Sequence, residues 1–149
     1  MRLLTILAAL GLASIAGAQP KGWQIIKDKT GVCQMAVPPD WHVNPQVPNM
    51  ATSPDISDVM ISAQAGREVR TIPDGAQQVL GVDKMIENTT KRVFWAGKAT
   101  SYPPSSPPVI AYHVTTPGKG GTCVGQITVK VGTSDALVKQ IADTVGPTK

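Results

Sequence analysis

The sequence has few of the side chains that usually carry catalysis or redox chemistry. Its 149 residues include only two histidines and two cysteines. The cysteines, Cys33 and Cys123, do not form the Cys-x-x-Cys pair that tunes thiol reactivity in redox centres. No Gly-x-Ser-x-Gly motif is present to hold a nucleophilic serine. We therefore expect a structural role for the cysteines and no serine-hydrolase centre.

Ligands for a soft metal are equally scarce. Zinc accepts two thiolates and two imidazoles, but its usual sites bring ligands together at much shorter spacings than this chain offers. The four residues available are Cys33, His42, His113 and Cys123. A blue-copper site needs a histidine and a methionine close to its cysteine near the C-terminal end, and neither follows Cys123. We expect no metal and no cofactor.

Strong charge of one sign and long apolar runs are also missing. The net charge of +4 is too mild, and the basic residues too scattered, to predict binding to nucleic acid or an anionic membrane. The apolar run over residues 3–16 is shorter than the roughly 20 residues of a membrane-spanning helix. It follows Arg2 and precedes a small-x-small site that ends at Ala18, the three regions of a secretory signal peptide. We predict a signal peptide over residues 1–18, cleaved near Ala18, and one secreted or periplasmic globular domain over residues 19–149.

Both cysteines fall on apolar faces of predicted strands. Cys33 shares one face of its strand with Met35 and Val37. Apolar and polar residues alternate around Cys123, with the apolar set comprising Cys123, Ile127, Val129 and Val131, and Gly125 on the same face. In an oxidising compartment an even number of cysteines favours a disulfide. We predict a Cys33–Cys123 bridge, with two free buried thiols as the alternative. The bridge would close a loop of about 90 residues, worth roughly 4 to 5 kcal/mol on the chain-entropy model.

Hydrophobic periodicity predicts six strands and two helices. The predicted strands cover residues 22–27, 32–37, 58–65, 89–96, 109–116 and 122–131. The predicted helices are residues 74–88, with Asp74 as N-cap, and a closing helix that begins at Ser134 or Asp135 and ends before Gly146. Residues 44–54 and 102–108 are rich in proline and small polar residues and are predicted to be exposed loops. The order β-β-β-α-β-β-β-α predicts an α+β fold, a mainly antiparallel sheet of about six strands with two amphipathic helices packed on it.

The end of the second predicted strand carries a short motif. Val37-Pro38-Pro39-Asp40-Trp41-His42-Val43 resembles the strand, proline and tryptophan opening of the PsbP-like family. The predicted last strand and helix resemble the way in which members of that family end. The family includes extrinsic photosystem II subunits and many exported bacterial proteins. The resemblance implies an antiparallel sheet between helices, but it implies no shared catalytic set, and the two cysteines lie outside the matched pattern.

With no catalytic motif, we expect an exported, non-catalytic binding or interaction module for an unknown protein or small-molecule ligand. A candidate partner surface comprises Trp41, His42, Tyr102, Pro103 and Pro104, because a proline-rich loop offers extended backbone to a partner. The alternative for that loop is a plain surface connection. The alternative function is a small exported hydrolase or metal-dependent enzyme that uses His42 or His113.

Two further features have more than one interpretation. Trp23, Trp41 and Trp95 could line a ligand groove, although a domain with a single phenylalanine needs them for core volume. Asn88-Thr89-Thr90 matches the N-glycosylation sequon, which matters only in a host that glycosylates exported proteins.

Overall fold

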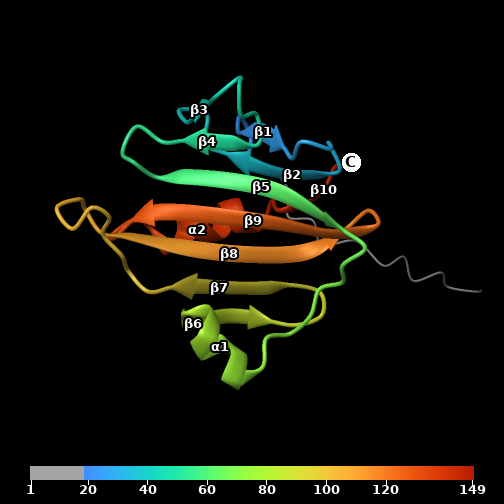
Figure 1. The fold of residues 1–149 in the computed structure, drawn as a ribbon. Coiled ribbons are helices and arrows are strands. Elements are labelled where there is room, and N and C mark those ends of the chain that lie inside the picture. The colour runs from blue at the N-terminus through green and yellow to red at the C-terminus, as the bar shows by residue number, and fades with distance from the viewer. Residues whose placement is uncertain (1–18) are drawn as a thin grey trace, which may run out of the picture.

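The computed structural model describes residues 19–149, and the predicted signal peptide, residues 1–18, lies outside them. The described residues form two antiparallel sheets and two helices. Figure 1 shows the larger sheet face on, with α2 behind it. The elements are β1 (Gln24–Lys27), β2 (Cys33–Val37), β3 (His42–Val43), β4 (Met50–Thr52), β5 (Asp58–Ala65), α1 (Asp74–Leu80), β6 (Val82–Asn88), β7 (Val93–Gly97), β8 (Val109–Gly118), β9 (Gly121–Lys130), α2 (Asp135–Ala142) and β10 (Gly146–Pro147).

The larger sheet has seven strands in the order β3-β4-β5-β9-β8-β7-β6, and the smaller has three in the order β1-β2-β10. β9 lies at the centre of the larger sheet, between β5 and β8. Its alternating sequence gives it two different faces. The inner face carries Cys123, Gly125, Ile127 and Val129, which are all buried. The outer face carries the residues between them, Val124, Gln126 and Thr128.

The three-stranded sheet and α2 pack on the inner face. A Cβ atom at Gly125 would lie only 2.7 Å from Met35 Cε of β2 and 2.7 Å from Val145 Cγ2. α2 contributes its buried stripe of Val138, Ile141 and Ala142. The Cys33–Cys123 disulfide joins β2 to β9 inside this core, and both residues are at most 1% exposed. The predicted disulfide is therefore confirmed, with both sulfurs in the core as the strand pattern indicated.

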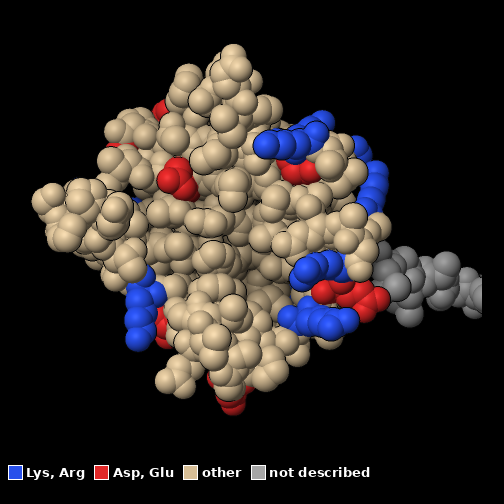
Figure 2. Space-filling view, in the orientation of Figure 1, with Lys and Arg blue, Asp and Glu red and all other residues tan. Residues whose placement is uncertain are grey.

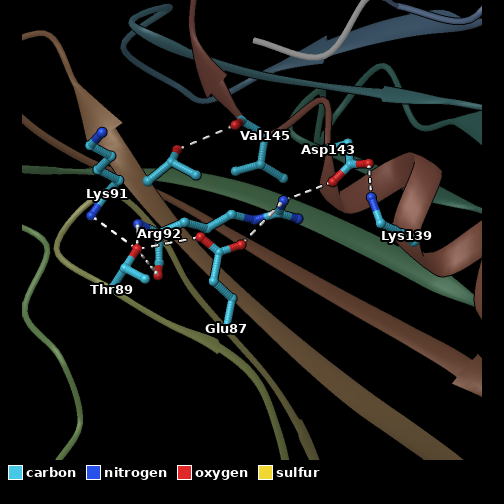
Figure 3. Close-up of polar contacts among 8 residues, drawn as sticks. Glu87, Thr89, Lys91, Arg92, Lys139, Asp143 and Val145 are labelled. Carbon is cyan, nitrogen blue, oxygen red and sulfur yellow. Dashed lines mark hydrogen bonds and ion pairs between the residues drawn. The ribbon is translucent and has the colours of Figure 1, made fainter. Parts of the chain in front are cut away.

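A polar cluster fixes the end of α2 to the sheet. The Arg92 guanidinium donates to Asp143 Oδ1 across 2.7 Å, and Lys139 Nζ donates to Asp143 Oδ2 across 2.6 Å (Figure 3). Glu87 lies on the other side of Arg92, at 3.8 Å. Arg92 also lies 5.1 Å above the ring centroid of Phe94, which is buried on the inner face. These contacts hold α2 to β6 and β7 through one half-buried arginine.

The predicted α+β class, the antiparallel pairing and the number of helices are confirmed, but the sheets have more strands than the expected six. Only α2 packs on the sheet with a buried stripe, since α1 has no buried residue. Residues 82–88, predicted to continue the first helix, form β6. α1 ends at Leu80 because Gly81 adopts a left-handed conformation, with φ of 73°. The apolar residues beyond that glycine belong to a strand of the sheet, since β6 pairs with β7. The predicted loop over residues 44–54 is interrupted by β4, which pairs with β3 and β5.

The ends of several strands also differ from the prediction. The strand expected over residues 89–96 runs from Val93 to Gly97, after a turn in which Thr89 N donates to Arg92 O across 2.9 Å. Gly146, expected to lie just beyond the closing helix, begins the two-residue strand β10, which pairs with β2.

No helix within residues 19–149 is long and apolar enough to cross a membrane.

Candidate functional site

Neither of the two described helices covers the outer face of the seven-stranded sheet. The three-stranded sheet and α2 occupy the inner face, and α1 lies beside β6 at the edge. Figure 2 shows the outer face as largely uncharged, with most of the Lys, Arg, Asp and Glu side chains near its margins. The row across its middle, read from strand pairing, is Met50, Met60, Gln126, His113, Trp95 and Met85.

An aromatic stack occupies the centre of that row. Trp95 of β7 and His113 of β8 are cross-strand partners whose ring centroids lie 4.1 Å apart at an interplanar angle of 18°. Burial lowers the pKa of His113, which favours the neutral imidazole at neutral pH. The neutral ring stacks on the indole and fixes its orientation on the outer face.

One irregular segment crosses the outer face near the ends of the strands. Residues 66–73, hereafter the crossing segment, run from β5 past the ends of β9, β8 and β7 to α1 (Figure 1). Gly66 N donates to Gly120 O across 2.8 Å at one end. At the other end Ile72 forms two hydrogen bonds with the Asn88 side chain, and Val69 between them is only 8% exposed. The segment is therefore held at both ends and in its middle.

A groove lies between the crossing segment and the sheet. It has a volume of about 640 Å³, and we call it the crossing groove. Its walls include Trp95, Val93 and Thr115 of the sheet, and Arg67, Glu68 and Arg70 of the segment. Its volume lies within the range typical of small-molecule sites, about 300–1,000 Å³. A second hollow of about 550 Å³ on the other side of the segment shares Arg67 and Glu68 with it.

The polar groups of the crossing groove are only partly used within the fold. Arg67, Glu68 and Arg70 are exposed and form no ion pair with another described residue. Thr122 also lines the groove, is 3% exposed, and its hydroxyl has no hydrogen-bond partner among the described residues. A buried hydroxyl without a partner costs about 1–3 kcal/mol. The groove therefore combines two unpaired guanidinium groups with an oriented indole, whereas the Thr122 hydroxyl is closed to solvent.

The residues predicted as a partner surface differ in how exposed they are. Trp41 is 6% exposed and belongs to the core, so it is not available to a partner. His42 is exposed on the edge strand β3. Tyr102 is 94% exposed in the loop between β7 and β8, and Pro103 and Pro104 beside it are exposed as well.

The two histidines do not come together. β3 and β8 are separated by β4, β5 and β9, so His42 and His113 lie roughly 19 Å apart across the sheet at the usual strand spacing. Within residues 19–149 no group of three or more His, Cys, Asp or Glu side chains is arranged to hold a metal ion. Of the expected chemical groups, only the two cysteines meet, and they form the disulfide.

The crossing groove was not predicted from the sequence, although Trp95 is one of the three tryptophans that could line a groove. The side chains of residues 66–73 are mostly polar or charged, as in a simple surface connection. The available signal was Val69, an apolar residue between Glu68 and Arg70, which indicates that one side of the connection packs against the fold. The far end of the crossing segment is held by the side chain of Asn88. No sequence pattern predicts these side-chain hydrogen bonds.

No protein-family model and no curated protein matches the chain. A solved structure of a protein from Bacteroides thetaiotaomicron has a TM-score of 0.58 and 15% sequence identity, and the match covers 86% of this chain and 49% of that one. The chain thus spans about half the length of that protein, and the similarity is one of fold alone. The Ran-binding protein Mog1p of Saccharomyces cerevisiae gives a TM-score of 0.46 at 10% identity, covering 82% of this chain and 86% of that one. A mutant of Mog1 gives a TM-score of 0.45 at 10% identity, covering 82% of this chain and 87% of that one.

Proposed function

We propose that the protein is an exported, non-catalytic binding module that takes its ligand on the outer face of the seven-stranded sheet. The observation that supports this most directly is the crossing groove. An oriented indole and two unpaired arginines line it together. A concave site with a few convergent polar groups is the usual form of a ligand site. The alternative, a hydrolase or metal-dependent enzyme using His42 or His113, receives less support because the two side chains lie on separate parts of the sheet.

Export is part of the proposal. A disulfide between β2 and β9 suits an oxidising compartment, as does the predicted signal peptide. Membership of the PsbP-like family belongs to the same proposal. It is supported by the β2 strand that runs into Pro38-Pro39-Asp40-Trp41, and by the ending of β9 followed by α2.

The test uses the three tryptophans as reporters. Protein labelled with fluorotryptophan gives one fluorine signal each for Trp23, Trp41 and Trp95, assigned by substitution. Fractions of the envelope and growth medium of the producing organism are then added. We expect an active fraction to move the Trp95 signal, with little effect on the buried Trp41, and to leave the bound component chemically unchanged over hours.

Two matched variants localise the effect. Gln126→Arg places a long charged side chain in the middle of the outer face, beside His113. Gln140→Arg makes the same change on the exposed surface of α2. The proposal requires the first variant to lose the response and the second to keep it. No response to any fraction, a response that Gln126→Arg leaves intact, or conversion of the bound component would each refute it.

A further inference from the structure

The chemistry of the crossing groove also indicates its ligand. We infer that the groove binds an acidic sugar, with the carboxylate of a uronic acid held by Arg67 and Arg70. This inference rests on the proposed function, because it assigns the ligand class of the same site. Three features of the site support it: the charge of the groove, the residues of its walls and the anchoring of the crossing segment.

The charge of the groove suits a single carboxylate. Arg67 and Arg70 both line it and have no ion-pair partner among the described residues. A guanidinium matches the geometry of a carboxylate or a phosphate with two parallel hydrogen bonds. Glu68 lines the same groove and leaves it with one net positive charge. A carboxylate carries one negative charge, whereas a phosphate monoester carries about 1.5 to 2 near neutral pH. The acidic residue therefore favours the carboxylate.

The walls of the groove suit a hydroxylated ring. Gln64, Thr115 and Thr122 are neutral hydrogen-bonding residues from β5, β8 and β9 that line the groove together. Thr115 is only partly buried on the groove wall, so a ligand hydroxyl can form a hydrogen bond with its side chain. Trp95 adds a flat apolar surface beside these polar groups. A sugar ring presents both an apolar face and a rim of hydroxyls, and it fits this combination better than a purely apolar acid does.

The backbone that carries the two arginines is held in place before a ligand arrives. Each is within three residues of an anchor: Gly66 is bonded to Gly120, Val69 is buried, and Ile72 is bonded to Asn88. A site that is already ordered loses less conformational freedom when the ligand binds. The crossing segment is therefore suited to present both guanidinium groups to the same ligand.

Titration with defined probes tests the inference. The probes are trigalacturonate and glucuronate, with maltotriose as the neutral sugar and inorganic phosphate as the competing anion. We expect at least one uronate probe to bind and to move the Trp95 fluorine signal, and maltotriose and phosphate to bind at least about tenfold more weakly. The double variant Arg67→Gln, Arg70→Gln should weaken uronate binding by about tenfold or more. The control Lys21→Gln, Lys27→Gln removes the same charge from the exposed start of the domain and should retain the affinity.

Thr115→Val separates a ligand contact from a structural role. Valine keeps the shape of threonine and removes the hydroxyl of a partly exposed residue on the groove wall. We expect weaker uronate binding with no loss of thermal stability. Equal binding of maltotriose, tighter binding of phosphate, an unchanged affinity in the double arginine variant, or no binding of either uronate would overturn the inference. If neither uronate binds but an envelope fraction still moves the Trp95 signal, the ligand class is wrong and the proposed function stands; if nothing moves it, both fail.

Discussion

The side-chain amide of Asn88 forms two hydrogen bonds to the backbone of a single residue, Ile72. Asn88 Oδ1 accepts from Ile72 N across 2.8 Å, and Asn88 Nδ2 donates to Ile72 O across 2.9 Å. The amide thus takes the place of a strand neighbour for one residue of the crossing segment. It joins the edge strand β6 to the segment that carries Arg67 and Arg70. The asparagine of the sequon therefore has a structural task in the folded protein.

Replacing Asn88 should release one end of the crossing segment. Asn88→Ala removes both hydrogen bonds, each worth about 0.5–1.5 kcal/mol, so we expect a loss of about 1–3 kcal/mol in urea unfolding. Trypsin should also cleave after Arg67 and Arg70 faster than in the native protein, because the freed segment opens locally. Gln78→Ala, an exposed change on α1, is the control and should alter neither quantity. An unchanged cleavage rate in Asn88→Ala would show that the segment is held by other contacts.

Any side chain at Gly125 should lower the stability of the protein. A methyl group there would lie 2.7 Å from both Met35 Cε and Val145 Cγ2, so Gly125→Ala forces the two packed layers to adjust. Overpacking of this kind costs about 1–3 kcal/mol, measured by thermal or urea unfolding. Met35→Ala removes one of the two clashing groups but also buried contacts of its own, so the double variant should lose less stability than the sum of the two single losses. Gly75→Ala in α1 is the matched control, because nothing lies within 4 Å of its new methyl group. It should leave stability unchanged or raise it by up to about 1 kcal/mol. A Gly125→Ala variant as stable as the native protein would contradict the close packing.

The residues of β9 explain why much of the fold could be predicted. Their alternation identifies a strand with one buried face, and the same alternation around Cys33 placed both sulfurs in one core. The predicted first helix is too long because apolar residues on both sides of Gly81 fit a helical stripe. The conformation of residues 82–88 is decided by the pairing of β6 with β7, which the local sequence does not show. The crossing groove could not be predicted because it depends on distant partners, such as Asn88 with Ile72, and on which strand ends lie side by side. The burial of Trp41 agrees with the need for tryptophan in the core volume and not with its place on the predicted partner surface.

The disulfide should account for a large part of the stability. It joins positions 90 apart in the sequence, for which the chain-entropy model gives roughly 4 to 5 kcal/mol. The double variant Cys33→Ala, Cys123→Ala should therefore unfold at much lower urea concentration than the oxidised protein. Reduced native protein serves as the control and should lose a similar amount. A thiol titration of unreduced, denatured protein should find no free thiol, and finding two would refute the bridge.

The ion pair between Arg92 and Asp143 should make stability depend on pH in the acid range. Burial acts to raise the pKa of Asp143, but hydrogen bonds from Lys139 and Arg92 and their positive charges outweigh it, so this pKa lies below its usual 3.8. Because the folded-state pKa is depressed, the stabilisation is fully present above the unfolded-state value. It is lost as the pH falls through the folded-state pKa. Asp143→Asn lacks this contribution at every pH. We expect the native protein to exceed it by about 1 kcal/mol near neutral pH, a modest value because Asp143 is 31% exposed.

The informative quantity is the difference in unfolding free energy between the native protein and Asp143→Asn. Other acids with depressed pKa values, such as Asp28, titrate in both proteins and cancel in this difference. The gap should stay constant from about pH 7 to about pH 5 and shrink as the pH falls below about 4. Lys139→Gln is the control for the exposed partner. It should cost only a few tenths of a kcal/mol, since Lys139 is 69% exposed whereas Arg92 is 19% exposed. A gap that persists unchanged at about pH 2 would mean that Asp143 acts through its shape and neutral hydrogen bonds. In that case the charge on its carboxylate would not be what holds α2 to the sheet.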